Sequence, residues 1–234
     1  MSERHTVHVA GLRLSYVVSG PPDAEPLVLL HGLGEGADDW ATVAPVFARD
    51  HRVYALDLRG HGRSGWPGRY SLELMRADVA GFLDALGLDR VRMVGHSMGG
   101  VVAWLLAAAA PDRVELLVLE EAPLPRPRTP APLVRPDGEL PFDWGMVVAV
   151  RRQLDTPPAD WLERLGDITA ETLVVAGGPS SHVPQDGVAE LADRIPGGRL
   201  LTIPAGHLVH AARPEAFTAA VSAFLSGRAS EDQQ

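Results

Sequence analysis

The stretch VRMVGHSMGG (residues 91–100) runs a short apolar segment into a serine flanked by glycines, and the chain continues as VVAWLLAAAA. The first run predicts a strand buried on both faces, and the second predicts a buried helix. Between them, residues 95–99 have the form G-x-S-x-G. A tight strand-to-helix turn strains the backbone at the serine, and glycines two residues away on either side avoid a collision. The pattern predicts that Ser97 stands above the sheet edge as a nucleophile, near the positive end of the helix.

Strand-like segments recur on both sides of this turn. They are residues 6–10, 12–19, 27–31, 52–57, 91–95, 115–120, 172–177 and 199–203. Several are continuous Val/Leu runs, which are typical of parallel strands covered on both faces. The first two are joined at Gly11 and predict a hairpin. Helical patterns cover residues 71–86, 98–110 and 214–225, so the order predicts an α/β fold with a mostly parallel, eight-stranded sheet flanked by helices.

Residues 123–170 interrupt this alternation, first as a Pro-rich run and then with aromatic side chains on short helical pieces. We interpret them as a short cap inserted over the carboxyl edge of the sheet, with a linker as the alternative for the first half. The core then comprises residues 1–122 and 171–227, and the polar residues 228–234 are expected to form a disordered tail. Some large side chains are expected to line a substrate pocket, or else to form the cap's own small core. They are Trp40, Phe142, Trp144, Met146 and Trp161.

Composition narrows the class of partner. The formal net charge of −9 disfavours nucleic acid and anionic membrane surfaces. The chain has no cysteine, which excludes disulfides and thiolate metal sites. Its first residues lack the apolar run of a secretory signal, and its longest apolar run is too short to span a bilayer. We expect a soluble, cytoplasmic protein that acts on a small molecule without a cofactor; the oligomeric state is open.

Two further motifs follow strands at the same predicted edge. His31-Gly32-Leu33-Gly34 comes after residues 27–31, and its glycines allow the N–H groups of Leu33 and Met98 to converge on a developing oxyanion. His207 follows the last strand and a glycine, where a neutral imidazole can accept the serine proton. His210 lies three residues later and could pair with His207 on a metal, but neither a third ligand nor an HExxH pattern accompanies them. No metal site is predicted.

The motifs GHSMGG, HGLG, DLRGHGRS and AGHLVHAARPEAF, in this order and at these spacings, resemble the α/β-hydrolase superfamily over residues 8–225. The charged residues of DLRGHGRS are interpreted as structural. The resemblance implies Ser97 as nucleophile, His207 as base, and Leu33 and Met98 as oxyanion donors. Epoxide hydrolases and dehalogenases of this superfamily carry aspartate at the elbow. The serine therefore favours acyl transfer to water, with an ester, thioester or lactone as substrate.

Other activities share these residues. Lyases and cofactor-free perhydrolases use the same triad in this superfamily, so the motifs do not separate them from esterases. A small-molecule-binding protein that kept the fold and lost turnover is the alternative from another class.

The acid of the triad is ambiguous. Many relatives in the superfamily carry an aspartate after the penultimate strand, but the matching stretch here, GGPSSHVP (residues 177–184), has Ser180 in that position. Some relatives instead carry the acid at the end of the strand after the nucleophile helix, where this chain has Glu120 and Glu121. Strand alternation sends these neighbours to opposite faces, so one is expected to face solvent, and we favour Glu120 as the acid. Glu121 and Asp186 are the alternatives.

Overall fold

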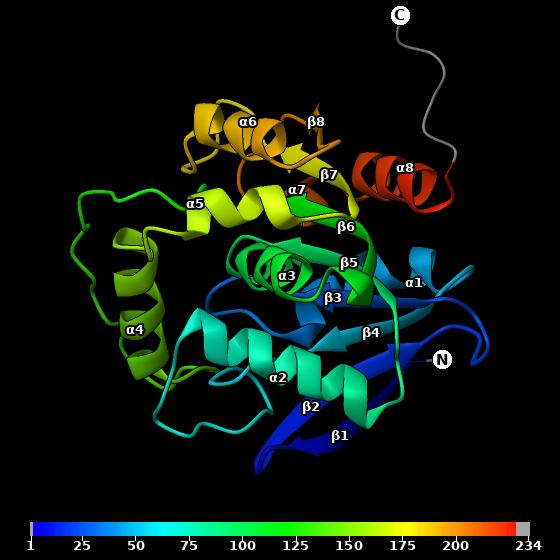
Figure 1. Ribbon diagram of the computed structural model, residues 1–234. Coiled ribbons are helices and arrows are strands. Elements are labelled where there is room, and N and C mark those ends of the chain that lie inside the picture. The colour runs from blue at the N-terminus through cyan, green and yellow to red at the C-terminus, as the bar shows by residue number, and fades with distance from the viewer. Residues whose placement is uncertain (1, 228–234) are drawn as a thin grey trace, which may run out of the picture.

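The centre of the computed structural model, which describes residues 2–227, is an eight-stranded sheet in the order β1-β2-β4-β3-β5-β6-β7-β8 (Figure 1). The strands are β1 (Glu3–Val9), β2 (Leu12–Ser19), β3 (Pro26–Leu30), β4 (Arg52–Leu56), β5 (Val91–His96), β6 (Val114–Glu120), β7 (Glu171–Ala176) and β8 (Arg199–Thr202). β2 is antiparallel to β1 and β4, and every other pairing is parallel. The predicted α/β fold and mostly parallel sheet are confirmed. The predicted tail, residues 228–234, lies outside the described residues.

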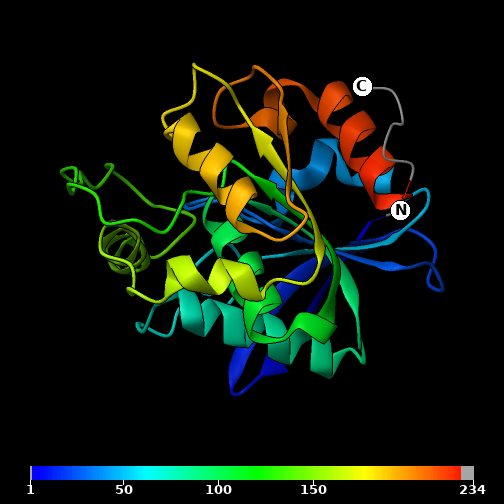
Figure 2. The ribbon, with the colours of Figure 1, turned by 45° about the horizontal axis from the view of Figure 1, so that its top comes forward.

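Helices cover both faces of the sheet (Figures 1 and 2). One layer contains α2 (Leu72–Ala85), α3 (Met98–Ala109) and α6 (Gln185–Arg194), and the other contains η1 (Ala37–Thr42), α1 (Ala44–Phe47), α7 (Val209–Ala212) and α8 (Pro214–Leu225). Alternation within single strands supplies both cores: Val28 and Leu30 pack in the first, whereas Leu27 and Leu29 pack in the second. A continuous apolar strand is therefore buried on both faces.

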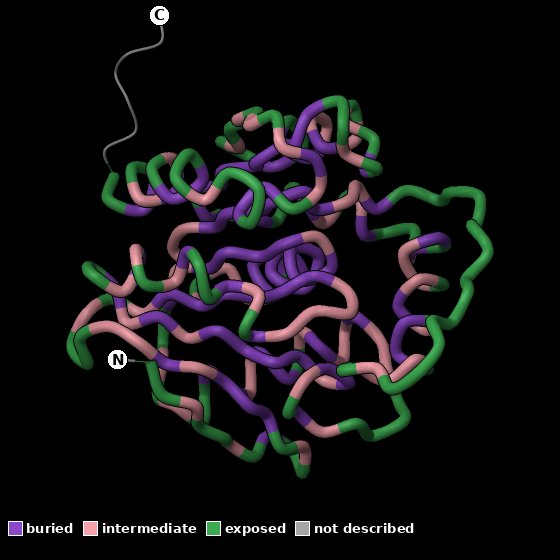
Figure 3. The backbone as a smooth tube through the Cα atoms, turned by 180° about the vertical axis from the view of Figure 1, so that it is seen from behind, coloured by how far each residue is buried: buried purple, intermediate pink, exposed green. Residues whose placement is uncertain are grey.

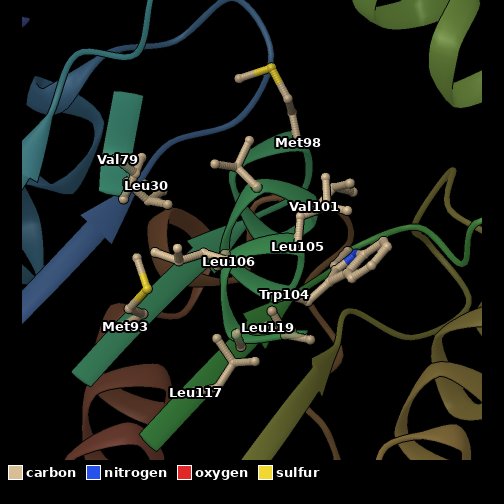
Figure 4. Close-up of a cluster of buried hydrophobic side chains, with 14 of the residues drawn as sticks. Leu30, Val79, Met93, Met98, Val101, Trp104, Leu105, Leu106, Leu117 and Leu119 are labelled. Atoms are coloured by element: carbon tan, nitrogen blue, oxygen red, sulfur yellow. The ribbon is translucent and has the colours of Figure 1, made fainter. Parts of the chain in front are cut away.

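The helix that follows the nucleophile motif is the centre of the larger core. Eleven of the 12 residues of α3 are buried, and Gly95 and Gly100 let it approach β5 and β6. Its side chains interdigitate with those of β3, β5 and β6 (Figure 4). A helix buried all round cannot shift without opening this core, so the position of its first residue is fixed by packing.

The chain between β6 and β7 leaves the sheet. Residues 126–139 are exposed and contain neither helix nor strand (Figure 3). They lead to α4 (Trp144–Asp155), which lies apart from the two helical layers, and then to α5 (Trp161–Arg164) and η3 (Leu165–Asp167) (Figure 1). A bridge between His61 and Phe142 connects this segment to the loop after β4. Its role as a cap stays a prediction.

Within residues 2–227, no helix combines the length and the apolar character needed to cross a membrane.

Replacing Gly99 with alanine tests whether packing fixes the start of α3. A Cβ there would lie 2.2 Å from the carbonyl oxygen of Leu30, which is backbone and cannot rotate away. We expect Gly99→Ala to lower the free energy of unfolding in urea by about 2–3 kcal/mol or more. Gly166→Ala is the matched control, because a Cβ at Gly166 meets nothing within 4 Å. Equal stability of the two variants would contradict this account.

Candidate active site

Ser97 occupies a strained turn between β5 and α3. Its backbone angles, φ 49° and ψ −113°, lie in a region that side-chain-bearing residues rarely adopt. A Cβ on Gly95 would lie 2.5 Å from the carbonyl oxygen of Gly99, so the turn needs glycine there as the sequence predicted. The N–H of Ser97 donates to the carbonyl of Glu120 at 2.8 Å. The turn is thus tied to β6, the strand that carries the two glutamates.

Ser97 lies at a pocket of about 440 Å³ that also receives Leu33, Met98 and His207. The structure therefore brings together the predicted nucleophile, base and oxyanion donors from three separate loops. The rest of the lining comes from the loop after β3, the end of β5, the segment between β6 and β7, and the loop after β7. It consists of Glu35, His96, Pro123, Arg128, Thr129, Ala131, Arg151, Leu154, Asp155, His182, Val183 and Pro184.

None of the five large side chains expected to line the substrate pocket does so. Trp40 is fully buried on the opposite side of the sheet, with its ring 4.5 Å from that of His210. Trp161 packs edge-on against Trp104 at 5.5 Å, inside the larger core. The other three lie elsewhere around the loops after β3 and β4.

Met146 is fully buried beside Gly60, and Phe142 lies over Gly34. Trp144 borders a separate surface hollow. Aromatic spacing on a short helix indicates an apolar face, but it does not show which neighbour that face contacts. For Met146 and Trp161 the neighbour is the main core, and the pocket prediction for all five residues is wrong.

Glu121, rather than the favoured Glu120, contacts the predicted base. Its Oε2 lies 3.3 Å from Nδ1 of His207, and its φ of 51° turns the backbone out of the strand. Both glutamates are fully buried, so the expectation that one faces solvent is also wrong. Asp186 is exposed at the start of α6, as an ordinary first-turn residue.

Three donors besides His207 hold the Glu121 carboxylate. The N–H of Gly177 donates to Oε1 at 2.5 Å, the side-chain amide of Gln185 donates to Oε1 at 3.0 Å, and the Ser181 hydroxyl donates to Oε2. Burial alone would raise the pKa of Glu121, but the hydrogen bonds from His207, Ser181, Gly177 and Gln185 outweigh it and lower the pKa. The carboxylate is therefore ionised beside the imidazole.

Sequence reasoning missed Ser181 and Gln185. Both lie in or next to the stretch where the expected aspartate is absent, and their hydroxyl and amide groups were the available signal. Ser180, which occupies the aspartate position, is exposed.

Glu120 forms a second carboxylate–histidine pair, with His210. Its Oε1 accepts the backbone N–H of His210 at 2.8 Å, and its Oε2 lies 2.8 Å from the ring Nδ1 of the same residue. On the other side of the ring, Nε2 lies 3.0 Å from Oδ2 of Asp39, an ion-pair distance without hydrogen-bond alignment. Burial alone would lower the pKa of His210, but Asp39 and Glu120 raise it to about 10. His210 is an imidazolium clamped between two carboxylates.

His96, inside the serine turn, connects the two pairs. Its Nε2 donates to the carbonyl of His207 at 3.0 Å, and its Nδ1 lies 3.3 Å from Oε2 of Glu35. Asp39, His96 and His210 also present ligand atoms within 4.8 Å of one another, a spacing that could hold a metal ion. A metal would need neutral imidazoles, and the raised pKa of His210 opposes this.

Asp57, in the charged stretch after β4, makes contacts that fit the expected structural role. The Asp57 carboxylate accepts the Ala37 N–H at 2.7 Å and the Arg63 N–H at 3.2 Å, and it pairs with Arg4 at 2.8 Å. It thereby fixes the loop next to the predicted oxyanion turn without lining the pocket.

Known proteins share this architecture. The family described as alpha/beta hydrolase fold matches residues 25–156, and the chain belongs to that family. It is 30% identical to the sn-1-specific diacylglycerol lipase ABHD11 of Mus musculus, over 92% of this chain and 86% of that protein. The enol-lactonase from Burkholderia xenovorans LB400 superposes with a TM-score of 0.84 at 26% identity, over 95% of this chain and all of that one.

A shorter match has higher identity. The chain is 37% identical to Epoxide hydrolase 4 of Mus musculus over 50% of its own length, but the match spans only about a third (33%) of that relative. The chain is thus an alpha/beta-hydrolase-fold protein, and the names of its relatives describe action on several kinds of bond.

The clamped imidazolium gives a prediction for pH dependence. Because the folded pKa of His210, about 10, lies above the ordinary 6.5, the stabilisation from this cluster is fully present below about pH 6.5 and is lost as pH rises through about 10. We expect the ¹⁵N shifts of the His210 ring to be those of a charged imidazolium at pH 8. Urea unfolding should lose a few kcal/mol between pH 7 and 10.5, and less in Glu120→Gln. A ring that is neutral at pH 8 would refute the assignment.

Proposed function

We propose that the protein is a serine hydrolase that cleaves a carboxylic ester, thioester or lactone of a small molecule through an acyl-enzyme. Ser97 is the nucleophile, His207 the general base and Glu121 the acid of the triad. The observation that carries the proposal is the contact between buried Glu121 and Nδ1 of His207, at the same pocket as a serine in a strained elbow.

In the first half-reaction the Ser97 hydroxyl attacks the acyl carbonyl while His207 takes its proton. The carboxylate of Glu121 holds the ring by Nδ1 and stabilises the imidazolium. The N–H groups of Leu33 and Met98, the latter at the N-terminus of α3, stabilise the oxyanion. His207 then protonates the leaving alcohol or thiol, and water repeats the sequence to release the acid and restore Ser97.

Two considerations favour this reaction over the epoxide ring opening of other family members. A serine at the elbow forms an acyl-enzyme, whereas ring opening of an epoxide in this family uses an aspartate there. The lipase and the lactonase named above are similar to this chain over most of its length, and both names describe the cleavage of acyl–oxygen bonds. A binding protein without turnover is favoured by Ser180 at the position where many relatives carry the triad aspartate, but Glu121 supplies the negative charge that Ser180 cannot.

Labelling with a fluorophosphonate tests the nucleophile. We expect intact-mass analysis to show one covalent adduct on the wild type and none on Ser97→Ala, because only an activated serine hydroxyl attacks phosphorus at a useful rate. A folded wild type that takes up no reagent would count against turnover and favour the binding-protein alternative.

The adjacent glutamates form a matched pair of variants for the acid. We expect Glu121→Gln to lower kcat on a reactive ester roughly 10⁴-fold, since loss of the acid leaves the base without charge stabilisation. Glu120→Gln should lower the free energy of unfolding, because it breaks the pair with His210, and should keep kcat within about tenfold. Steady-state kinetics and urea unfolding of both variants show which glutamate acts as the acid and which one stabilises the fold. The reverse ranking in kcat would make Glu120 the acid.

A further inference from the structure

One guanidinium at the catalytic pocket has no carboxylate partner. Arg151 lies on α4, lines the pocket that contains Ser97 and His207, and has a buried Nε without a hydrogen-bond partner among residues 2–227. Arginine is always charged, and a cation that is partly withdrawn from water binds an anion more strongly than a fully solvated one does. The pocket therefore contains a positive charge that the described part of the protein does not neutralise.

The obvious internal partner is already occupied. Asp155 lies one helical turn after Arg151, the spacing of an intrahelical ion pair. Its Oδ1 instead accepts from Nε of Arg128 at 2.6 Å, and its carbonyl accepts the Arg128 N–H at 3.0 Å. The long loop before α4 thus folds back to neutralise Asp155, and Arg151 is left facing the pocket.

The other pocket carboxylate is also held elsewhere. Oε2 of Glu35 accepts the Gly32 N–H at 3.0 Å and lies 3.3 Å from Nδ1 of His96. None of the ion pairs among residues 2–227 includes Arg151. Burial lowers the pKa of His182, and the guanidinium charges of Arg151 and Arg128 lower it further against the opposing effect of Glu121. The wall of the pocket beside the predicted base is therefore positive.

We propose that Arg151 binds a carboxylate of the substrate, so that the preferred substrates are esters or lactones that carry a free carboxylate in addition to the scissile acyl group. The inference rests on the proposed function and deepens it. One unpaired guanidinium matches one monoanion, and its planar fork matches the two oxygens of a carboxylate. A volume of about 440 Å³ admits a short diacid monoester.

The test compares monomethyl esters of succinic, glutaric and adipic acid with the same esters in which the free acid is a primary amide. The amide has the same shape and no charge. We expect kcat/KM for the best acid ester to exceed that for its amide by about 10- to 100-fold. Arg151→Gln should reduce this ratio to near one, mainly through KM for the acid, and Arg151→Lys should restore part of it.

Arg152→Gln is the matched control. Arg152 is the adjacent arginine on α4, and it is exposed and outside the pocket lining. The Arg152→Gln variant should keep the wild-type ratio of kcat/KM for the acid ester to kcat/KM for the amide. An acid-to-amide ratio near one in the wild type, or an equal loss of the ratio in both glutamine variants, would overturn the inference.

A binding measurement separates this inference from the proposed function. Calorimetry with glutarate on Ser97→Ala protein reports the anion site without turnover. Binding that Arg151→Gln weakens about tenfold or more, and Arg152→Gln does not, supports the site even where no ester is cleaved. If a fluorophosphonate labels Ser97 but glutarate binding does not depend on Arg151, the anion site is refuted and the hydrolase assignment stands.

Discussion

Two adjacent carboxylates, fully buried at the end of β6, are the constraint on which the arrangement of the site depends. A buried carboxylate is stable only when its oxygens are paired. Glu120 is paired with His210, and Glu121 is paired with His207, Ser181, Gln185 and the Gly177 N–H. The loop after β8 and the loop after β7 are therefore both tied to one strand end. That strand end is also hydrogen-bonded to Ser97.

The same packing holds the strained backbone of Ser97 in place. The turn is held on one side by the β5–β6 ladder and on the other by α3, which is buried almost all round. Gly99 passes against the carbonyl of Leu30, the last residue of β3, so the elbow and the start of the Leu33 turn are positioned by one close backbone contact. The proposed nucleophile and oxyanion donors are consequently positioned by the sheet.

The sequence was sufficient for the sheet and the elbow because apolar runs and glycine spacing express packing directly. It was insufficient for the acid that we propose. Alternation correctly separates Glu120 from Glu121, but the left-handed backbone at Glu121 redirects its side chain, and no residue pattern signals a positive φ at a glutamate. The pocket lining failed for a related reason. Arg128 lies in an irregular loop, Arg151 on α4 and His182 in the loop after β7, and no sequence pattern indicates that these three segments meet at one pocket.

The two histidines of GHLVH show why the same carboxylate–imidazole pair can serve different ends. His210 has a carboxylate on each side and is fully buried, so a proton on it is held through the neutral pH range. His207 has Glu121 on Nδ1 alone, and its side chain keeps 19% of its surface exposed towards the pocket with Ser97. A base must release the proton that it accepts, and a second carboxylate would prevent this. Asp39 therefore gives His210 a structural role, and the open face of His207 fits the general base proposed for it.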